Sequence, residues 1–280
     1  MAVVDAVHRN RVLSTDQIAS LFFPAADGMV SSACRTRLRH LAAAGFLERS
    51  EVPQTRSEGR RPYVYFLTAF GRDLLVAEIG YEPDEIDWKP GYNNVRWPFL
   101  EHQLSINDAY VAFRGATEQV GWTVERWVDD RFLKKEHIET VAVADENGVE
   151  RQVAVVPDAY FILSREETLL HFFLEIDRTT MIVGTPERLT HSFARRIQAY
   201  QAYFASEAIL TQYKTRKIRV LTVTTGERRL ASLKAVTEQI GGKMRYWFTT
   251  ADRLNGNTSL SSPIWQVASG REPYALLARP

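Results

Sequence analysis

Cysteine, long apolar runs and nucleotide-binding loops are scarce or absent in this sequence. The chain has a single cysteine, Cys34, so it can form neither an intrachain disulfide nor a zinc site built from cysteines. No apolar run approaches the roughly 18 residues of a membrane-spanning helix, and the first residues lack a signal-peptide pattern. We therefore expect a cytoplasmic protein with no membrane association. No glycine-rich phosphate loop of the P-loop or dinucleotide type is present, so no nucleotide-binding motif supports a nucleotide-dependent enzyme.

Bulk charge is also nearly absent, because the formal net charge is only +1. The arginines are nevertheless unevenly placed. Residues 1–80 contain no lysine, but they hold ten arginines against eight acids. Within residues 30–65 there are seven arginines and three acids. A local excess of arginine is typical of a phosphate-binding surface, so the charge pattern predicts nucleic-acid binding by one short stretch.

The length of 280 residues predicts more than one domain. Residues 81–98 are rich in Pro, Gly, Asn and Trp, and the patterns before and after them differ. We therefore expect a first domain over residues 1–80, a connector over 81–98, and a second domain over 99–280.

Two short helices across a tight turn are predicted near the N-terminus. Ser14, followed three residues later by Gln17, forms a capping box at the start of the first of these helices. Ser31 or Ser32 begins the second, which ends at Gly45. This arrangement predicts a helix-turn-helix.

The second of these helices has two distinct faces. Cys34, Leu38 and Leu41 recur at helical spacing and are expected to face a core. The polar face carries side chains that can contact DNA, namely Ser32, Arg35, Thr36 and Arg39. A helix with such groups outward can enter a major groove, where arginine reaches guanine edges or phosphates. Taken alone, the same pattern also fits a solvated helix face.

Two strands and a basic loop follow this helix. Residues 46–49 and 62–67 are rich in strand-forming side chains. The loop carries Arg56, Arg60 and Arg61, which we expect to contact phosphates. A further helix follows Thr68.

The order of these elements resembles that of the winged-helix transcription factors over all of residues 1–80. Two phrases support the resemblance: Leu-Ala-Ala-Ala-Gly-Phe-Leu before the loop and Tyr-Phe-Leu-Thr-x-x-Gly after it. The resemblance implies an N-terminal winged helix-turn-helix domain with double-stranded DNA as its partner.

The rest of the chain alternates between helix and strand patterns. Helices are expected over residues 100–117, 189–204 and 228–240. Strands are expected over residues 124–128, 153–163 (as a pair or as one kinked strand), 169–177, 218–224 and 245–249. The order of helix, three strands, helix and strand resembles the PD-(D/E)XK nuclease core, a mixed α/β sheet. The predicted fold class of the whole chain is α+β.

Three carboxylates fit the active site of such a core. Asp158 lies early in one predicted strand, while Glu175 and Asp177, two residues apart in another, point to the same face. Clustered carboxylates suit Mg²⁺ or Mn²⁺, which could activate water for phosphodiester cleavage. The lysine expected after Glu-x is missing, and Arg178, which follows Asp177, cannot act as a base. An inactive relative of the nucleases is equally compatible with this pattern.

The order of motifs along the chain is similar to that of the replication-relaxation proteins of bacterial plasmids and integrative elements. After the winged helix come His102 with Asn107-Asp108, then Pro157-Asp158-Ala159, then Glu175-Ile176-Asp177-Arg178-Thr179. The resemblance covers roughly residues 1–205. It implies a role in plasmid replication or in DNA relaxation before transfer, and His102 could be an extra ligand or a base near the carboxylates.

Two hypotheses on function remain open. The first is a DNA-binding protein with a metal-dependent nuclease-like domain that acts with replication or mobilisation proteins. The second is a transcriptional regulator whose α/β domain forms a homodimer or senses a ligand. Binding of Mg²⁺ at Asp158, Glu175 and Asp177 would distinguish them.

Overall fold

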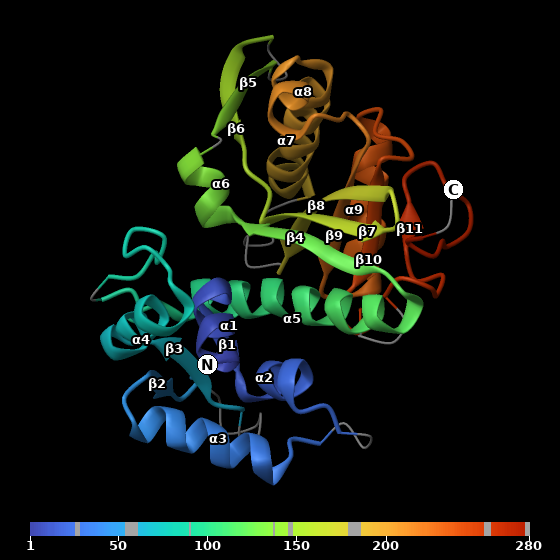
Figure 1. Ribbon diagram of the computed structural model, residues 1–280. Helices are drawn as coiled ribbons and strands as arrows, with labels where there is room; N and C mark the ends of the chain where they lie inside the picture. Colours follow the sequence, from blue (N-terminus) through green and yellow to red (C-terminus); the bar gives the residue numbers. More distant parts are fainter. Residues whose placement is uncertain are drawn as a thin grey trace. The chain divides into compact units, whose positions relative to one another are not determined.

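The chain divides into two compact units, Met1–Val111 and Ala112–Pro280. The computed structural model describes all residues except 26–28, 54–60, 90, 137, 145–147, 179–185, 255–258 and 278–280, and it also leaves the side chains of 136 and 186–192 undescribed (Figure 1). The boundary between the units falls within the helix α5 (Trp97–Val120). In the described ranges, no helix has both the length and the apolar character needed to cross a membrane.

The first unit combines helices with a small antiparallel sheet. Its elements before α5 are α1 (Ala2–Asn10), β1 (Val12–Ser14), α2 (Thr15–Phe22), α3 (Ser32–Ala43), β2 (Leu47–Ser50), β3 (Val64–Leu67) and α4 (Ala69–Ile79). The strand order is β1-β3-β2, with β3 antiparallel to both neighbours. The two strands expected from the sequence are thus present as β2 and β3, while the short strand β1 was not expected.

The helix starts follow the local sequence. The predicted capping box is confirmed: the backbone N–H of Gln17 donates to Ser14 Oγ at 3.1 Å, and the Ser14 N–H donates to Gln17 Oε1 at 2.9 Å. The cap of α3 is Ser31, whose Oγ accepts from the Cys34 N–H at 3.2 Å. Ser32 is therefore the first residue of α3 and is exposed.

The core of the first unit lies between its helices and its sheet. The predicted apolar face of α3 is buried through Cys34, Leu38 and Leu41, in one cluster with Leu13 and Ile18. Burying these side chains stabilises the first unit through the hydrophobic effect.

The second unit contains a six-stranded mixed sheet, so the predicted α+β class is confirmed. Its elements are the end of α5, β4 (Thr123–Asp129), α6 (Asp130–Glu136), β5 (Glu139–Ala144), β6 (Glu150–Val155), β7 (Ala159–Arg165), β8 (Thr168–Asp177), α7 (Pro186–Ala205), α8 (Ala208–Tyr213), β9 (Ile218–Thr224), α9 (Glu227–Gln239), β10 (Tyr246–Thr250) and β11 (Gln266–Val267). The strand order is β11-β10-β9-β8-β7-β4. The strands β8, β9 and β10 run parallel, and the other neighbours are antiparallel.

The segment predicted over 153–163 is a pair of strands that belong to different sheets. β6 pairs with β5 in a separate two-stranded sheet, whereas β7 pairs with β4 and β8 in the main sheet. Asp158 lies in the short connection between them.

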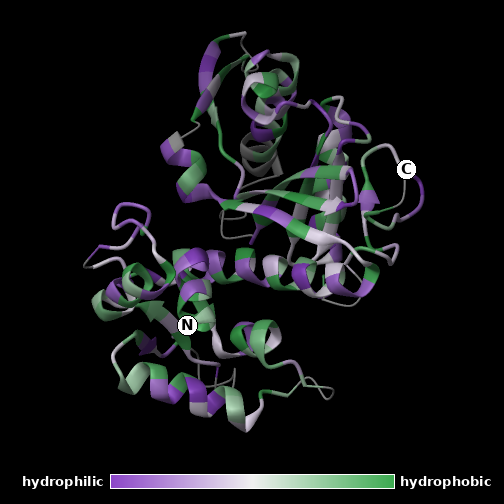
Figure 2. Cartoon of the chain, viewed as in Figure 1, coloured by the Kyte–Doolittle hydropathy of each residue, from purple (hydrophilic) through white to green (hydrophobic). Residues whose placement is uncertain are grey.

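Both faces of the main sheet are covered. On one face, Phe173 of β8 packs in a cluster with Tyr200 and Phe204 of α7 and with Leu230 of α9. On the other, Phe161 of β7 stacks with Phe172 and packs in a tilted arrangement against Phe113 of α5. Burial on two faces explains why β7 and β8 are almost continuously hydrophobic (Figure 2).

Candidate functional site

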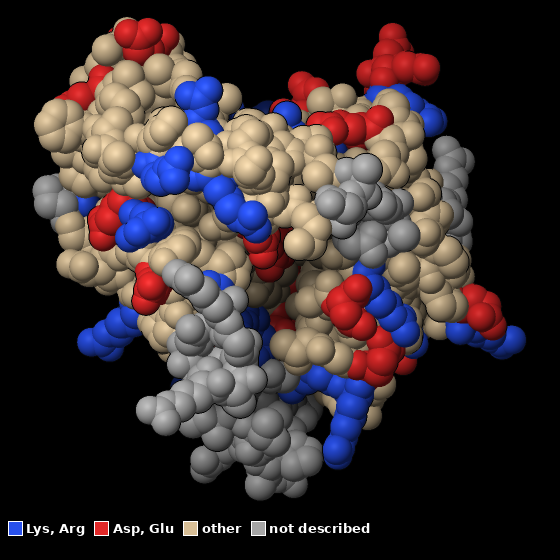
Figure 3. All heavy atoms as spheres, turned by 90° about the horizontal axis from the view of Figure 1, so that it is seen from below, with Lys and Arg blue, Asp and Glu red and all other residues tan. Residues whose placement is uncertain are grey.

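A cavity of about 600 Å³ opens in the first unit beside α3. We call it the arginine cavity, because the described residues that line it include Arg35, Arg39, Arg49 and Arg61. Asp16 is the one acid among these lining residues. Figure 3 shows the face that lies at the bottom of Figure 1, where α3 is located, and several basic side chains lie on this face. A concave surface with this excess of positive charge suits an anionic ligand.

The polar face of α3 supplies part of the cavity. Arg35, Thr36 and Arg39 are exposed and line it, while Ser32 is exposed at the start of the helix. Within the part of the chain that the structure describes, no acid forms an ion pair with Arg35 or Arg39. Arg35 and Arg39 thus bring to this side of the cavity two positive charges that no described carboxylate neutralises.

Two further arginines are held by aromatic rings. The guanidinium carbon of Arg49 lies 4.5 Å from the ring centroid of Tyr63. That of Arg61 lies 5.1 Å from the ring of Trp97, and Arg61 Nη1 is 3.6 Å from an oxygen of Glu101. Stacking restricts a guanidinium without neutralising it, so Arg49 is oriented with its charge intact, whereas Arg61 is oriented by both the ring of Trp97 and the carboxylate of Glu101.

Arg49 was not among the DNA-contacting residues expected from the sequence. Arg49 is one of the arginines in the local excess over residues 30–65. The sequence of a strand as short as β2 does not indicate which of its side chains face a cavity. Of the three loop arginines, Arg61 lines the cavity, whereas Arg56 and Arg60 lie outside the described residues.

The start of α2 also lines the cavity, through Thr15 and Asp16. The Thr15 backbone N–H donates to the Tyr63 carbonyl at 2.9 Å, and Thr15 Oγ1 donates to the same oxygen at 3.2 Å. This pair of bonds joins α2 to the segment that leads into β3. An acid in the first turn of a helix also stabilises that helix, which is a sufficient structural reason for Asp16.

The three carboxylates of the second unit are held by different groups. Asp158 is fixed beside β8, because its N–H donates to the Leu174 carbonyl at 3.0 Å and its Oδ2 accepts from the Ile176 N–H at 2.7 Å. Glu175 and Asp177 both contact helices that pack on the sheet: Glu175 contacts α7 and Asp177 contacts α9.

Glu175 is buried, with 3% of its surface exposed. Its Oε2 accepts from Arg196 Nη1, and its Oε1 accepts from the Tyr200 hydroxyl. Burial raises the pKa of Glu175 above its ordinary value, against the opposing effect of Arg196, and the nearby charge of Asp158 adds to the rise. The attraction of Glu175 in turn raises the pKa of Arg196, so this guanidinium stays charged.

Asp177 forms a two-pronged ion pair with α9. Arg229 Nη2 donates to Asp177 Oδ1 and Arg229 Nε donates to Oδ2, both at 2.9 Å. Thr224 Oγ1 donates to Oδ2 at 2.7 Å. This bidentate geometry is the strong form of an arginine–carboxylate pair, and it uses both oxygens of the carboxylate.

The donor set therefore does not fit a divalent cation. In the described ranges, no group of three His, Cys, Asp or Glu side chains is arranged to hold a metal ion. Glu175 is instead paired with Arg196, and Asp177 with Arg229. Neither partner is Arg178, the arginine that directly follows Asp177 in the sequence. His102 belongs to α5 within the first unit, whereas the carboxylates belong to the second.

Comparisons with known proteins point to one family. A family model described as replication-relaxation matches residues 5–221. No curated protein matches the chain. A solved structure of the restriction endonuclease FokI bound to DNA matches with a TM-score of 0.27 and 12% identity, over 90% of this chain and 42% of that one. A second FokI structure gives a TM-score of 0.30 and 10% identity over the same shares. This chain thus matches less than half of the length of the FokI chain.

Proposed function

The chain belongs to the replication-relaxation family, and we propose that its first unit is a winged helix-turn-helix module that binds double-stranded DNA. In this proposal α2 and α3 are the helix-turn-helix, and β2 and β3 with the loop between them are the wing. The element order α1-β1-α2-α3-β2-β3-α4 supports it. The 12 residues of α3 span about 18 Å, which suits a helix inserted into a major groove.

The observation that carries the proposal is the arginine cavity. Arg35 and Arg39 are exposed on it and form no ion pair with any described residue. Like charges gathered on one concave surface repel each other, and a bound polyanion relieves that repulsion. Phosphates of a duplex supply this charge in a regular array.

The contacts divide into two kinds. Ser32, Arg35, Thr36 and Arg39 project from α3 and would reach base edges, so they would determine sequence preference. The arginines of β2 and of the wing would contact phosphates and determine affinity; these are Arg49, Arg56, Arg60 and Arg61.

A double substitution tests the proposal. Arg35→Ala with Arg39→Ala is expected to weaken duplex binding by roughly 2–5 kcal/mol, because each bidentate base contact is worth about 1–3 kcal/mol. The probe is a labelled duplex selected from a randomised library by the wild-type protein, measured by fluorescence anisotropy. Arg37→Ala is the matched control, since Arg37 is exposed on α3 but is not among the residues that line the cavity.

The proposal fails if the double variant keeps wild-type affinity with an intact circular dichroism spectrum. It also fails if Arg37→Ala loses as much affinity as either single variant, Arg35→Ala or Arg39→Ala, because each of these removes one charge and binding would then depend on net charge alone. Family membership supports a role for this DNA binding in replication or relaxation of a bacterial plasmid or integrative element, and hence in the cytoplasm.

For the second unit we propose a scaffold that dimerises or senses a ligand, in preference to a metal-dependent nuclease. The ion pairs Arg196–Glu175 and Arg229–Asp177 favour this choice, because they occupy the carboxylates that a nuclease would offer to a cation. Sedimentation equilibrium of the whole chain tests dimerisation, and titration with Mn²⁺ tests the nuclease hypothesis.

A further inference from the structure

Three buried amide side chains join α5 to the turn between α1 and β1 and to the start of α2, all within the first unit. Gln17, Gln103 and Asn107 are 4%, 7% and 1% exposed, respectively. We call them the amide network. Buried amides are costly unless they are hydrogen-bonded, and each of these three has a hydrogen-bond partner on a neighbouring element.

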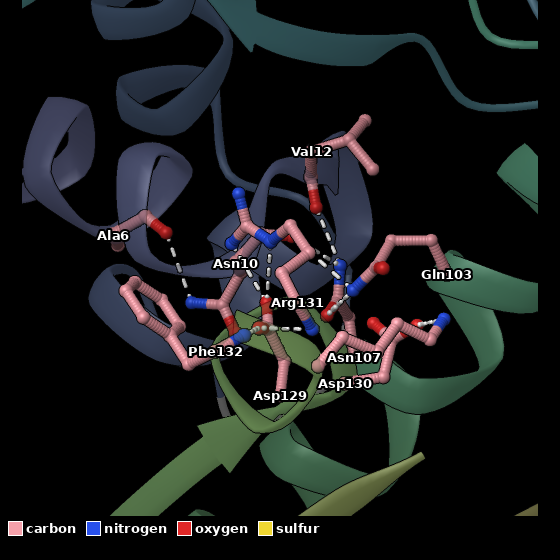
Figure 4. Close-up of polar contacts among 10 residues, drawn as sticks. Ala6, Asn10, Val12, Gln103, Asn107, Asp129, Asp130, Arg131 and Phe132 are labelled. Atoms are coloured by element: carbon pink, nitrogen blue, oxygen red, sulfur yellow. Dashed lines mark hydrogen bonds and ion pairs between the residues drawn. The ribbon is translucent and has the colours of Figure 1, made fainter. Parts of the chain in front are cut away.

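Asn107 holds the turn from α1 into β1. Its Nδ2 donates to the Asn10 carbonyl at 3.2 Å and to the Val12 carbonyl at 2.5 Å (Figure 4). Gln103 Nε2 donates to Asn107 Oδ1 at 3.1 Å, which fixes the orientation of the Asn107 amide. The two carbonyls flank Arg11, whose φ of 68° is in the left-handed region. The network thus stabilises a turn that the backbone of Arg11 disfavours.

Gln17 holds the start of α2 to the same helix. Its Oε1 accepts from the Ser14 N–H in the capping box, so its amide orientation is fixed. Its Nε2 donates to the Leu104 carbonyl at 2.9 Å and to Asp108 Oδ1 at 2.6 Å. One side chain therefore caps α2 and attaches it to α5.

The hydrogen bonds of Gln17 lie next in sequence to residues that line the arginine cavity. Thr15 and Asp16, which line the cavity, immediately precede Gln17. The strand β1 has only three residues between the turn held by Asn107 and the first residue of α2. The position of the start of α2, which lines the same cavity as the α3 arginines, thus depends on α5.

We propose that Gln17, Asn107 and Asp108 are positioning residues of the DNA site: they hold the start of α2 on α5 and so keep the arginine cavity open to a duplex. This role rests on the proposed function of the first unit. Asn107 and Asp108 form part of the motif that resembles the replication-relaxation proteins. In this proposal their role is structural, because their contacts are with the α1–β1 turn and with Gln17 of α2.

Asp108 offers a test that separates position from charge. It is exposed, so its substitution leaves no cavity in the core. Asp108→Asn and Asp108→Ala both remove one negative charge, but only asparagine keeps an oxygen that can accept from Gln17 Nε2. We expect Asp108→Asn to bind the selected duplex at least as tightly as the wild type. We expect Asp108→Ala to bind it about threefold to tenfold more weakly than Asp108→Asn, because alanine cannot accept from Gln17 Nε2.

Amide hydrogen exchange supplies a second readout that needs no DNA. Faster exchange in the first turn of α2 in Asp108→Ala, with α3 unchanged and Asp108→Asn like the wild type, supports the positioning role. Equal affinity and equal exchange in the two variants overturn it. If Arg35→Ala with Arg39→Ala lowers affinity while the Asp108 variants match each other, the positioning role alone is refuted. If the wild-type chain binds no duplex, the proposed function fails and the positioning role fails with it.

Discussion

Arg49 lies over the ring of Tyr63, with 4.5 Å between the guanidinium carbon and the ring centroid, and both side chains line the arginine cavity. The contact joins β2 to the residue just before β3, two elements whose register places Ser50 opposite Val64. The guanidinium is thus oriented by the sheet, with its charge still available to a phosphate.

If Arg49 contacts one phosphate of the duplex, its substitution should remove that single contact. Arg49→Ala should reduce the slope of log K against log salt concentration by about 0.9, the value for one phosphate. Arg49→Lys should keep that slope, because the charge remains, but it should bind more weakly because lysine lacks the planar stacking group. An unchanged slope in Arg49→Ala would show that the duplex does not reach β2.

The wing makes a larger contribution in our proposal. Neutralising Arg56, Arg60 and Arg61 together should flatten the salt dependence by about two to three units of slope, at roughly 0.9 per phosphate. Arg72→Ala is the control, since Arg72 lies on α4 and is already paired with Asp73 at 2.7 Å. Equal slopes for the triple variant and the wild type would place the wing away from the DNA backbone.

Gly71 is required by close packing between α4 and the start of β2. A Cβ at this position would lie 2.2 Å from the Phe46 carbonyl oxygen and 2.7 Å from Leu67 Cδ1. Backbone cannot move away as a side chain does, so Gly71→Ala should destabilise the first unit by about 2–3 kcal/mol. At Gly226 a Cβ meets nothing within 4 Å, so Gly226→Ala should cost no more than about 1 kcal/mol, the effect of a poorer N-cap residue on α9. Urea unfolding measures both, and similar losses in the two variants would contradict the packing argument.

His171 should make the second unit sensitive to mild acid. Its Nδ1 is 2.7 Å from the Tyr160 hydroxyl, and burial lowers the pKa of His171 from its ordinary 6.5. Burial also raises the pKa of Tyr160 to about 12, so the phenol stays protonated and donates to the neutral imidazole. Since the folded state binds this proton less readily than the unfolded state, stability is fully present above pH 6.5 and falls as the pH drops through the lowered pKa.

The matched variant is His171→Gln, which offers an acceptor to Tyr160 without titrating. Between pH 7 and about 5, wild-type stability should fall more steeply than that of the variant, by at most about 1.4 kcal/mol per pH unit. Urea midpoints at a series of pH values measure the difference. Parallel curves would mean that His171 does not titrate over this range.

Features that depend on residues close together in the sequence could be predicted from the sequence alone. Ser14 and Gln17 are three residues apart, so the capping box needs no knowledge of the fold. The helical spacing of Cys34 and Leu38 likewise identified the buried face of α3. Each of these features depends on residues within one or two turns.

Features that depend on contacts between residues far apart in the sequence could not be predicted from it. The strand β1 is only three residues long and exists because Val12 pairs with Phe66. Arg49 reaches the cavity because of its partner across the sheet. The contacts of Glu175 come from α7, 21 residues further along the chain, so sequence spacing could group the acids but could not supply their arginine partners.

The ion pair between Arg196 and Glu175 leads to the last prediction. Isothermal titration of the wild-type chain with Mn²⁺ should show no site that depends on Asp158, because Arg196 and Arg229 already neutralise Glu175 and Asp177. Arg196→Met should destabilise the second unit, since it leaves Glu175 buried without its cation. The arginine side chain is 46% exposed, so solvent screening limits the loss to about 1–3 kcal/mol.

A second substitution shows whether that loss comes from the unpaired charge. Adding Glu175→Gln to Arg196→Met should recover most of the lost stability, because an amide can still accept from the Tyr200 hydroxyl without burying a charge. Mn²⁺ binding to the wild type that disappears in Asp158→Ala would instead mean that a cation displaces Arg196 from Glu175. In that case the ion-pair interpretation is wrong, and the nuclease hypothesis would be favoured over the scaffold.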